Sequence, residues 1–143
     1  MSPTPQCELI YEAIADIADV QSLGQSALGQ RYIVNILGGE FHGPQMNGVI
    51  LPGGADRQLV RPDGIKELDA LYEMQTDDGV ILTVHNQVII DMPQTEQRYA
   101  RSVVRFRAPA GRYEWLNRRV FVGSLESLKP ARNAVKICVF QLN

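Results

Sequence analysis

The residue best suited to chemistry follows a sharp bend in the chain. The segment Leu51-Pro52-Gly53-Gly54-Ala55-Asp56 combines residues that bend the backbone and let it approach another group closely. We interpret Asp56 as a candidate acid or base at the mouth of the fold. The alternative is a carboxylate that caps the turn by accepting backbone N–H bonds. Catalysis near neutral pH would require burial to raise the pKa of Asp56 from about 3.9.

A second candidate lies in the segment Gly38-Gly39-Glu40-Phe41-His42-Gly43-Pro44. Residues two apart on a strand point the same way, so Glu40 and His42 could cooperate in proton transfer. The alternative is a surface turn in which both side chains are exposed. The two glycines do not form a phosphate-binding loop, because neither a helix start nor a Walker lysine follows them.

Five further residues are candidate contacts of a ligand. Tyr72 would place a hydroxyl donor inside the fold, or would simply pack in the core. Arg105 stands between apolar residues, so if it points inward it needs a partner such as a ligand carboxylate. Trp115 and Asn117 would form a pocket wall and a polar anchor, or serve packing and turn formation. Gln58, at the start of a short predicted strand, completes the set.

The sequence predicts neither a metal nor an organic cofactor. It has two histidines, His42 and His85, and lacks the H-x-H spacing of cupin-type metal sites. No G-x-S-x-G elbow is present. Cys7 and Cys138 fall in apolar strands near opposite ends of the chain, and we expect them to be buried, inert, free thiols.

Composition indicates one ordinary globular domain. The 143 residues suit a single domain over 1–143, with 1–6 as a flexible start. A net charge of −2 and a pI of about 5.6 provide no basic stripe for nucleic acid. The sequence shows neither an apolar run that could span a membrane nor a signal peptide, so we expect a cytoplasmic protein with no membrane partner.

Short runs of β-branched residues between Gly, Pro, Asn and Asp indicate many strands. The clearest hairpin joins residues 68–76 to 80–90 through Asp77-Asp78-Gly79. On its first strand, Tyr72 shares an apolar face with alternate residues.

The N-terminal region is less distinct. Residues 7–15 fit a strand, although a short helix over 11–20 also fits. Residues 22–30 are rich in Gly, Ser and Gln and are interpreted as a loop. The apolar last strand, 135–142, needs a partner that the first strand could provide. Eight to ten strands must hide their edges, and we expect an all-β protein with a single antiparallel barrel and little helix.

These segments resemble the family called domain of unknown function 3237 in order and spacing. The resemblance is carried by the 36–44 and 48–56 segments, Leu68-Asp69-Ala70, Tyr72, 76–79, Tyr113-Glu114-Trp115-Leu116-Asn117 and Phe121-Val122-Gly123. It covers most of the chain from about residue 7. It implies a compact barrel-like fold and homo-oligomers, and it implies little about activity.

The sequence is compatible with two functions. In the first, the barrel binds a small apolar or aromatic metabolite, and Asp56, Glu40 and Tyr72 catalyse a cofactor-free isomerisation, dehydration or cyclisation. In the second, the protein is a non-catalytic ligand-binding module, or an oligomeric assembly module whose barrel is filled. A filled interior would exclude the first function, whereas an accessible carboxylate in an apolar cavity would support it.

Overall fold

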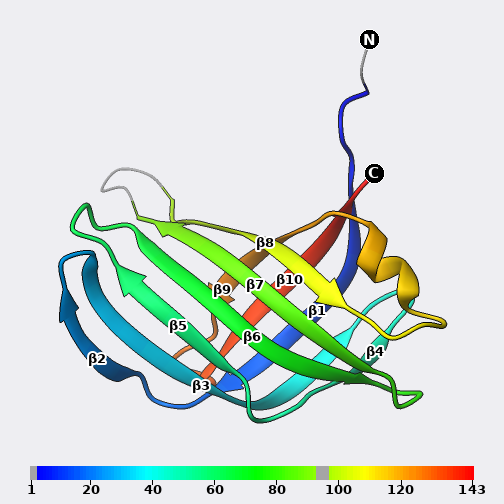
Figure 1. Ribbon diagram of the computed structural model, residues 1–143, viewed down its shortest axis with the longest axis horizontal. Coiled ribbons are helices and arrows are strands. Elements are labelled where there is room, and N and C mark those ends of the chain that lie inside the picture. The colour runs from blue at the N-terminus through cyan, green and yellow to red at the C-terminus, as the bar shows by residue number, and fades with distance from the viewer. Residues whose placement is uncertain (1–2, 93–96) are drawn as a thin grey trace.

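The chain folds into an antiparallel β-barrel (Figure 1). The computed structural model describes residues 3–92 and 97–143. The strands are β1 (Cys7–Ile17), β2 (Gln21–Ser26), β3 (Gly29–His42), β4 (Asn47–Ile50), β5 (Ala55–Val60), β6 (Lys66–Thr76), β7 (Ile81–Asp91), β8 (Tyr99–Arg107), β9 (Phe121–Ser127) and β10 (Ala134–Leu142). One short 3₁₀ helix, η1 (Glu114–Arg118), lies between β8 and β9. The all-β barrel with little helix is as predicted.

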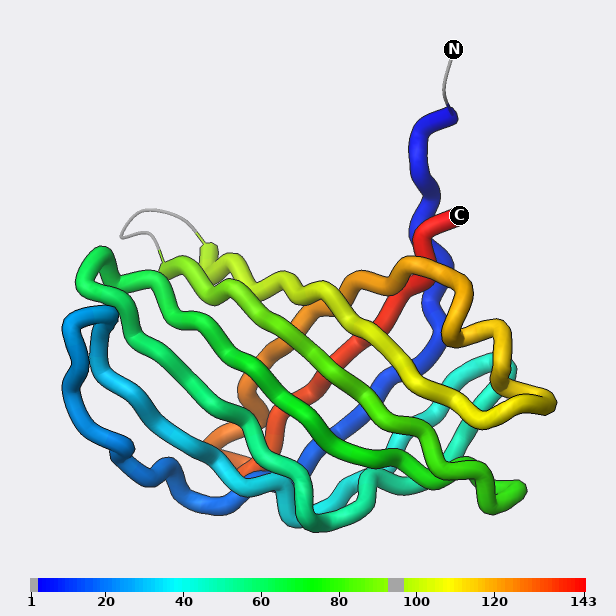
Figure 2. The backbone as a smooth tube through the Cα atoms, in the orientation of Figure 1, coloured from blue at the N-terminus to red at the C-terminus, as the bar shows by residue number. Residues whose placement is uncertain are grey.

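The first strand closes the barrel. One edge of β1 pairs with β10 and the other with the second half of β3, so the sheet returns on itself. The predicted pairing of the first and last strands is therefore confirmed. Figure 2 shows the two ends of the chain leaving the barrel side by side, where Gln6 and Asn143 exchange backbone hydrogen bonds of 3.1 and 2.8 Å.

Strands β4 and β5 occupy the same position in the wall, one after the other. Each pairs with β3 on one side and with β6 on the other. The bend between them is the Pro-Gly-Gly segment noted in the sequence. Gly53 has a φ of +106°, and a Cβ on Gly54 would lie 2.4 Å from the Cβ of Tyr72. Glycine at position 54 therefore lets the bend pack directly against β6.

The predicted hairpin is confirmed. The Gly79 amide donates to the Thr76 carbonyl at 2.9 Å, and the Thr76 amide donates to the Val80 carbonyl at 2.9 Å. Gly79 takes a φ of +87°, which a non-glycine residue rarely adopts. Tyr72 is 1% exposed, so the alternation along this strand correctly predicted its inner face.

One half of the barrel is filled with large side chains. Tyr11, Phe41, Phe106 and Phe121 form a chain of edge-to-face contacts with ring centroids 4.9 to 6.2 Å apart. Methionine and aliphatic side chains complete this cluster, which includes Met46, Met74, Leu82 and Leu116. The other half holds smaller side chains, and its core cluster consists of Leu68, Val88, Ile90 and Ala100. The aromatic side chains of the interior are therefore concentrated in one half of the barrel.

Some local predictions were wrong. In the expected loop over 22–30, residues 22–26 lie in strand β2, which pairs with the first half of β3, and residues 29–30 begin β3. The alternative helix over 11–20 does not form, because β1 runs to Ile17. The cysteines are free but not buried: Cys7 is exposed, and Cys138 is partly exposed beside Glu12 on the outer face.

Within residues 3–92 and 97–143, no helix has the length and apolar character needed to cross a membrane.

Replacing Tyr72 with alanine should destabilise the protein. Its ring is buried against the filled half of the barrel, and large-to-small changes of this kind cost about 3 kcal/mol or more. Chemical denaturation should show this loss for Tyr72→Ala. Tyr72→Phe, which keeps the ring, should stay within about 1 kcal/mol of the parent protein. A denaturation midpoint unchanged by Tyr72→Ala would contradict the burial.

Candidate functional site

A small cavity lies in the less filled half of the barrel. Its volume is about 70 Å³. It is lined mostly by apolar residues, namely Ala15, Ile17, Val34, Ile36, Leu68, Ala70, Val88, Leu125, Val135 and Ile137, together with the polar residues Asp56, Gln58, Tyr72 and Asn86. Ile17, Leu125 and Val135 are only partly buried, whereas Tyr72 and Asn86 are fully buried. The cavity therefore opens at the end of the barrel away from the aromatic cluster.

Strand β5 carries Asp56 and Gln58 to this cavity. Residues two apart on a strand share a face, so both side chains enter the interior while Arg57 between them points outward. The Gln58 amide donates to Asp56 Oδ2 at 2.8 Å. Asp56 Oδ1 is buried and has no partner with hydrogen-bond geometry among the described residues, and the backbone N–H of Asp69 lies close enough to the carboxyl group to oppose the rise in its pKa. Asp56 thus lies on a strand with a free acceptor, and is not the turn cap that the alternative interpretation proposed.

The environment of Asp56 favours its neutral form. Burial raises the pKa of Asp56 to about 6, and the hydrogen bond from Gln58 and the charge of Lys66 only partly oppose this effect. A carboxyl group with this pKa changes between acid and base close to neutral pH. That is the property required of a general acid–base catalyst.

Tyr72 adds a hydroxyl to the same cavity. Burial raises its pKa far above the ordinary value, and the nearby Asp56 carboxylate raises it further, so the phenol stays protonated. The hydroxyl of Tyr11 lies behind it, and its pKa is also raised, first by burial and then by Tyr72. Neither hydroxyl has a partner with hydrogen-bond geometry among the described residues. The Tyr72 hydroxyl is therefore a buried donor beside the carboxylate, with the Tyr11 hydroxyl next to it outside the cavity lining.

Asn86 is the site residue that sequence reasoning missed. It is 2% exposed, and its Oδ1 has no hydrogen-bond partner among the described residues. Strand pairing places Asp56 opposite Ala70, and Ala70 opposite Asn86. The small Ala70 side chain thus separates two polar groups on adjoining strands. A signal was present in the sequence: Asn86 is a polar residue between Val84 and Val88 on an otherwise apolar face.

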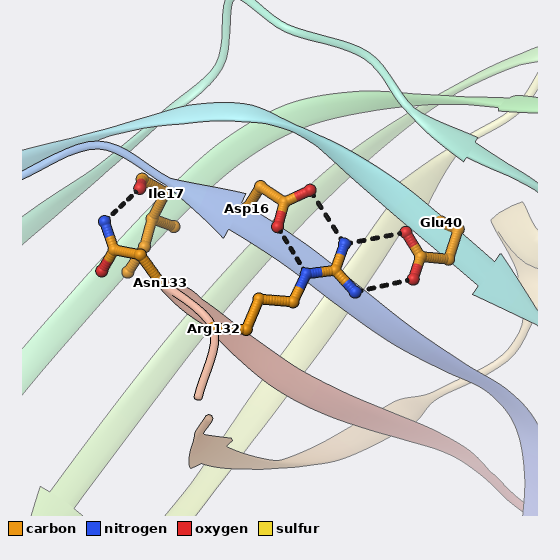
Figure 3. A network of polar contacts seen from close by, with 5 residues as sticks. All are labelled: Asp16, Ile17, Glu40, Arg132 and Asn133. Atoms are coloured by element: carbon orange, nitrogen blue, oxygen red, sulfur yellow. Dashed lines mark hydrogen bonds and ion pairs between the residues drawn. The ribbon is translucent and has the colours of Figure 1, made fainter. Parts of the chain in front are cut away.

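Glu40 does not reach the cavity. It lies on the outer face, where Arg132 bridges it to Asp16 (Figure 3). The Arg132 guanidinium donates to Glu40 Oε1 at 3.0 Å and to Asp16 Oδ1 at 2.8 Å. This contact lowers the pKa of Asp16 and ties the loop after β9 to strands β1 and β3. His42, on the same face, is exposed.

The other three candidate residues also lie away from the cavity. Arg105 was expected to contact a ligand carboxylate only if it pointed inward, and it is exposed on the outside of β8. Trp115 packs on Phe121, with ring centroids 6.1 Å apart. The Asn117 amide donates to the Ala108 carbonyl at 2.9 Å and accepts from the Ala108 amide at 2.8 Å, which fixes a loop. Asp56, Gln58 and Tyr72 are the predicted residues that the fold brings together.

No group of three His, Cys, Asp or Glu residues suited to holding a metal ion occurs within residues 3–92 and 97–143. The polar groups that line the cavity are the Asp56 carboxyl group, the Gln58 and Asn86 amides and the Tyr72 hydroxyl.

The fold and cavity define a small closed β-barrel with a polar site at one open end. The chain belongs to the family described as "Protein of unknown function (DUF3237)", whose model matches residues 5–142. The resemblance seen in the sequence is thereby confirmed.

Relatives of known structure share this fold along their whole length. A UPF0311 protein of Rhodopseudomonas palustris is 35% identical over 97% of this chain and 96% of its own. The crystal structure of a conserved protein of unknown function from that organism has a TM-score of 0.91, at 35% identity and covering 99% and 100% of the two chains. A β-barrel-like protein from Acinetobacter baumannii has a TM-score of 0.90 at 29% identity, covering 100% and 99%.

A more distant structural relative is an enzyme. This protein, from Penicillium herquei, has a TM-score of 0.79 at 24% identity, with 100% of this chain and 98% of the enzyme covered. At this identity the likeness shows the fold alone.

The raised pKa of Asp56 predicts a pH dependence of folding. A carboxyl group that holds its proton more tightly when folded stabilises the protein fully below its unfolded pKa, and this contribution is lost as pH rises through the folded pKa. With values of 3.8 and about 6, the whole effect is about 3 kcal/mol, of which about 2.4 kcal/mol is lost between pH 4 and pH 7.

Denaturant unfolding of the parent protein and of Asp56→Asn isolates this contribution. The parent should lose about 2.4 kcal/mol relative to Asp56→Asn as pH rises from 4 to 7, because asparagine cannot ionise. The variant should remain folded throughout. A free-energy difference that stays constant with pH would show that the pKa of Asp56 is ordinary.

Proposed function

We propose that this protein binds a small apolar or aromatic molecule at the open end of its barrel and catalyses a cofactor-free acid–base reaction on it. The reaction class is isomerisation, dehydration or cyclisation. The observation that carries the proposal is the Asp56 carboxyl group, which has an unpartnered oxygen and a pKa raised to about 6 in an apolar cavity.

Asp56 would transfer the proton. In its ionised form it accepts a proton from a carbon or hydroxyl of the ligand, and as the acid it returns the proton at another position. An isomerisation or an addition that closes a ring needs no other reactant, because the proton removed at one atom is the proton delivered at the next. Gln58 holds Oδ2 of the carboxyl group and leaves Oδ1 free for this exchange.

Tyr72 and Asn86 would orient the ligand. The Tyr72 hydroxyl remains a donor because its pKa is raised, so it can stabilise a ligand oxygen that gains negative charge. Asn86 Oδ1 can accept a hydrogen bond from a ligand hydroxyl. A ligand that satisfies these atoms would remove the desolvation penalty they carry in the free protein.

The lining favours an uncharged ligand. The lining itself contains no Lys, Arg or His, so a carboxylate or phosphate inside the cavity would lie next to Asp56 and touch no cation, since Lys66, whose charge acts on Asp56, lies outside the lining. The volume of about 70 Å³ is smaller than the roughly 300–1,000 Å³ of pockets for drug-sized ligands. We infer that the reacting group enters the cavity while the rest of the ligand lies at its opening.

A second candidate function is supported by the filled half of the barrel. The packed aromatic cluster shows that much of the interior serves stability, and a binding module or an assembly unit would need no more. The enzyme from Penicillium herquei supports catalysis only to the extent that its fold is the same. Turnover, and not binding alone, separates the two functions.

Thermal-shift screening should test the site. We expect neutral phenols, enols and hydroxyketones to raise the melting temperature, whereas benzoate and phenyl phosphate should not. A ligand at 100 times its Kd adds about 2.7 kcal/mol of stability. The stabilisation should be lost in Asp56→Asn and reduced in Asn86→Ala, and any turnover should be lost in Asp56→Asn.

Glu40→Gln is the matched control, because it neutralises a carboxylate on the outer face. It should leave the ligand-induced shift unchanged. Equal loss of the shift in Glu40→Gln and Asp56→Asn would place the site elsewhere. Binding without turnover for every hit would favour the non-catalytic module.

A further inference from the structure

The outer face of three neighbouring strands carries two stripes of opposite charge. Strand β6 presents acidic residues and β8 presents basic ones, with β7 between them. The acidic stripe is Glu67, Asp69 and Glu73, and the basic stripe is Arg101, Arg105 and Arg107. The three arginines are exposed, and none forms an ion pair with an acidic residue of the described chain. In the acidic stripe, Glu67 contacts Arg61 at 3.3 Å and Asp69 contacts His85 at 2.7 Å, both at the surface.

The strand register aligns these charges in rows. Glu67 pairs with Ile89, which pairs with Arg101. Glu73 pairs in the same way with Thr83, which pairs with Arg107. Glu67 and Glu73 are thus each two strands, or roughly 10 Å, away from an arginine, and neither forms an ion pair with it. Asp69 shares its row with Val103.

Apolar side chains lie among the charges. Leu71, Ile89 and Val103 are 55%, 42% and 48% exposed, although each stands on a central strand of the wall. Shallow hollows of about 420 and 540 Å³ border these side chains, and both extend onto β5 at Arg57. An outer face with several large exposed apolar residues and unpaired arginines has the composition of a contact surface.

We propose that this face, the outer surface of β6, β7 and β8, binds a second copy of the chain to form a two-fold dimer whose axis runs along β7. Rotation by 180° about such an axis places β6 of one copy over β8 of the other. Each row of paired residues then lies over the same row of the partner. Glu67 of one copy then faces Arg101 of the other, and Glu73 faces Arg107. The symmetry makes each of these contacts twice.

The charge pattern selects this orientation over the other face-to-face arrangement. A two-fold axis perpendicular to the strands would place β6 on β6 and β8 on β8, so that like charges meet. A partner of uniform charge would match one stripe and be repelled by the other. The outer surface of a barrel is convex, so about three strands can make contact, which is the width of the charged pattern.

Charge exchange tests the proposal, with sedimentation velocity and light scattering on the full chain as readouts. The parent protein should be a dimer. Glu67→Arg and Arg101→Glu should each raise the dimer Kd on the order of tenfold or more, because each creates like-charge contacts at two symmetric places. The double variant Glu67→Arg/Arg101→Glu should restore dimerisation, since it exchanges the charges without altering their complementarity.

Glu126→Arg, an exposed charge change on β9 outside the three strands, is the control and should leave the dimer intact. Circular dichroism should show that all variants keep the parent fold. A monomeric parent protein would overturn the proposal, as would single variants that remain dimeric. A double variant that stays monomeric, or equal disruption by Glu126→Arg, would place any self-association on another surface.

Discussion

Closure of the barrel by β1 is the constraint on which the rest of the structure depends. This strand pairs with β10 on one edge and with β3 on the other, which removes both free edges from the main wall. Once the wall is closed, every second residue must enter a confined interior and every other residue must face outward. A polar residue at an inward position then has to find a partner in that interior, face a cavity or remain unsatisfied. Asp56, Tyr72 and Asn86 are at such positions, and each retains an unpartnered polar atom among the described residues.

The two halves of the interior have different roles. The aromatic side chains of β1, β3, β8 and β9 pack edge to face in one half, together with Met46 and Met74, which provides stability and rigidity. The bend between β4 and β5 lies near the boundary, where Gly54 lets the chain pack against Tyr72. Beyond that boundary the inward side chains become smaller, with Ala15, Ala70 and Val34 around the carboxyl group. A rigid half thus supports an open half in which burial can raise the pKa of Asp56.

The sequence predicted the fold class because strand alternation and turn residues are local signals. The Asp77-Asp78-Gly79 turn, the inward face of Tyr72 and the pairing of the end strands were all found in this way. Strand β2 was missed because its residues are exposed and show no apolar alternation, so its pairing depends on the backbone of β3. The alternation of inward and outward positions along each strand would also have distinguished the candidate residues that face the interior from those that face solvent. Phe41 and Phe106 point inward, which forces Glu40 and Arg105 outward, whereas Asp56 and Gln58 share an inward face. Whether inward-facing residues meet at one cavity depends on the curvature of the closed wall. Local alternation along a strand does not predict that curvature.

The candidate site and the proposed dimer contact use the same part of the wall from opposite sides. Tyr72 and Asn86 point into the cavity from β6 and β7, while their neighbours Leu71, Glu73, His85 and Gln87 point outward on those strands. A partner packed on this outer face would restrain the strands that position the polar groups, without adding a side chain to the cavity. The outer face also has polar contacts within one chain that keep its strands in register. His85 Nε2 lies 2.7 Å from Asp69 Oδ1, and Thr83 donates to Glu73 at 2.9 Å. Contacts on both faces of the wall therefore stabilise the register of β5, β6 and β7. This register sets the position of Asn86 relative to Asp56.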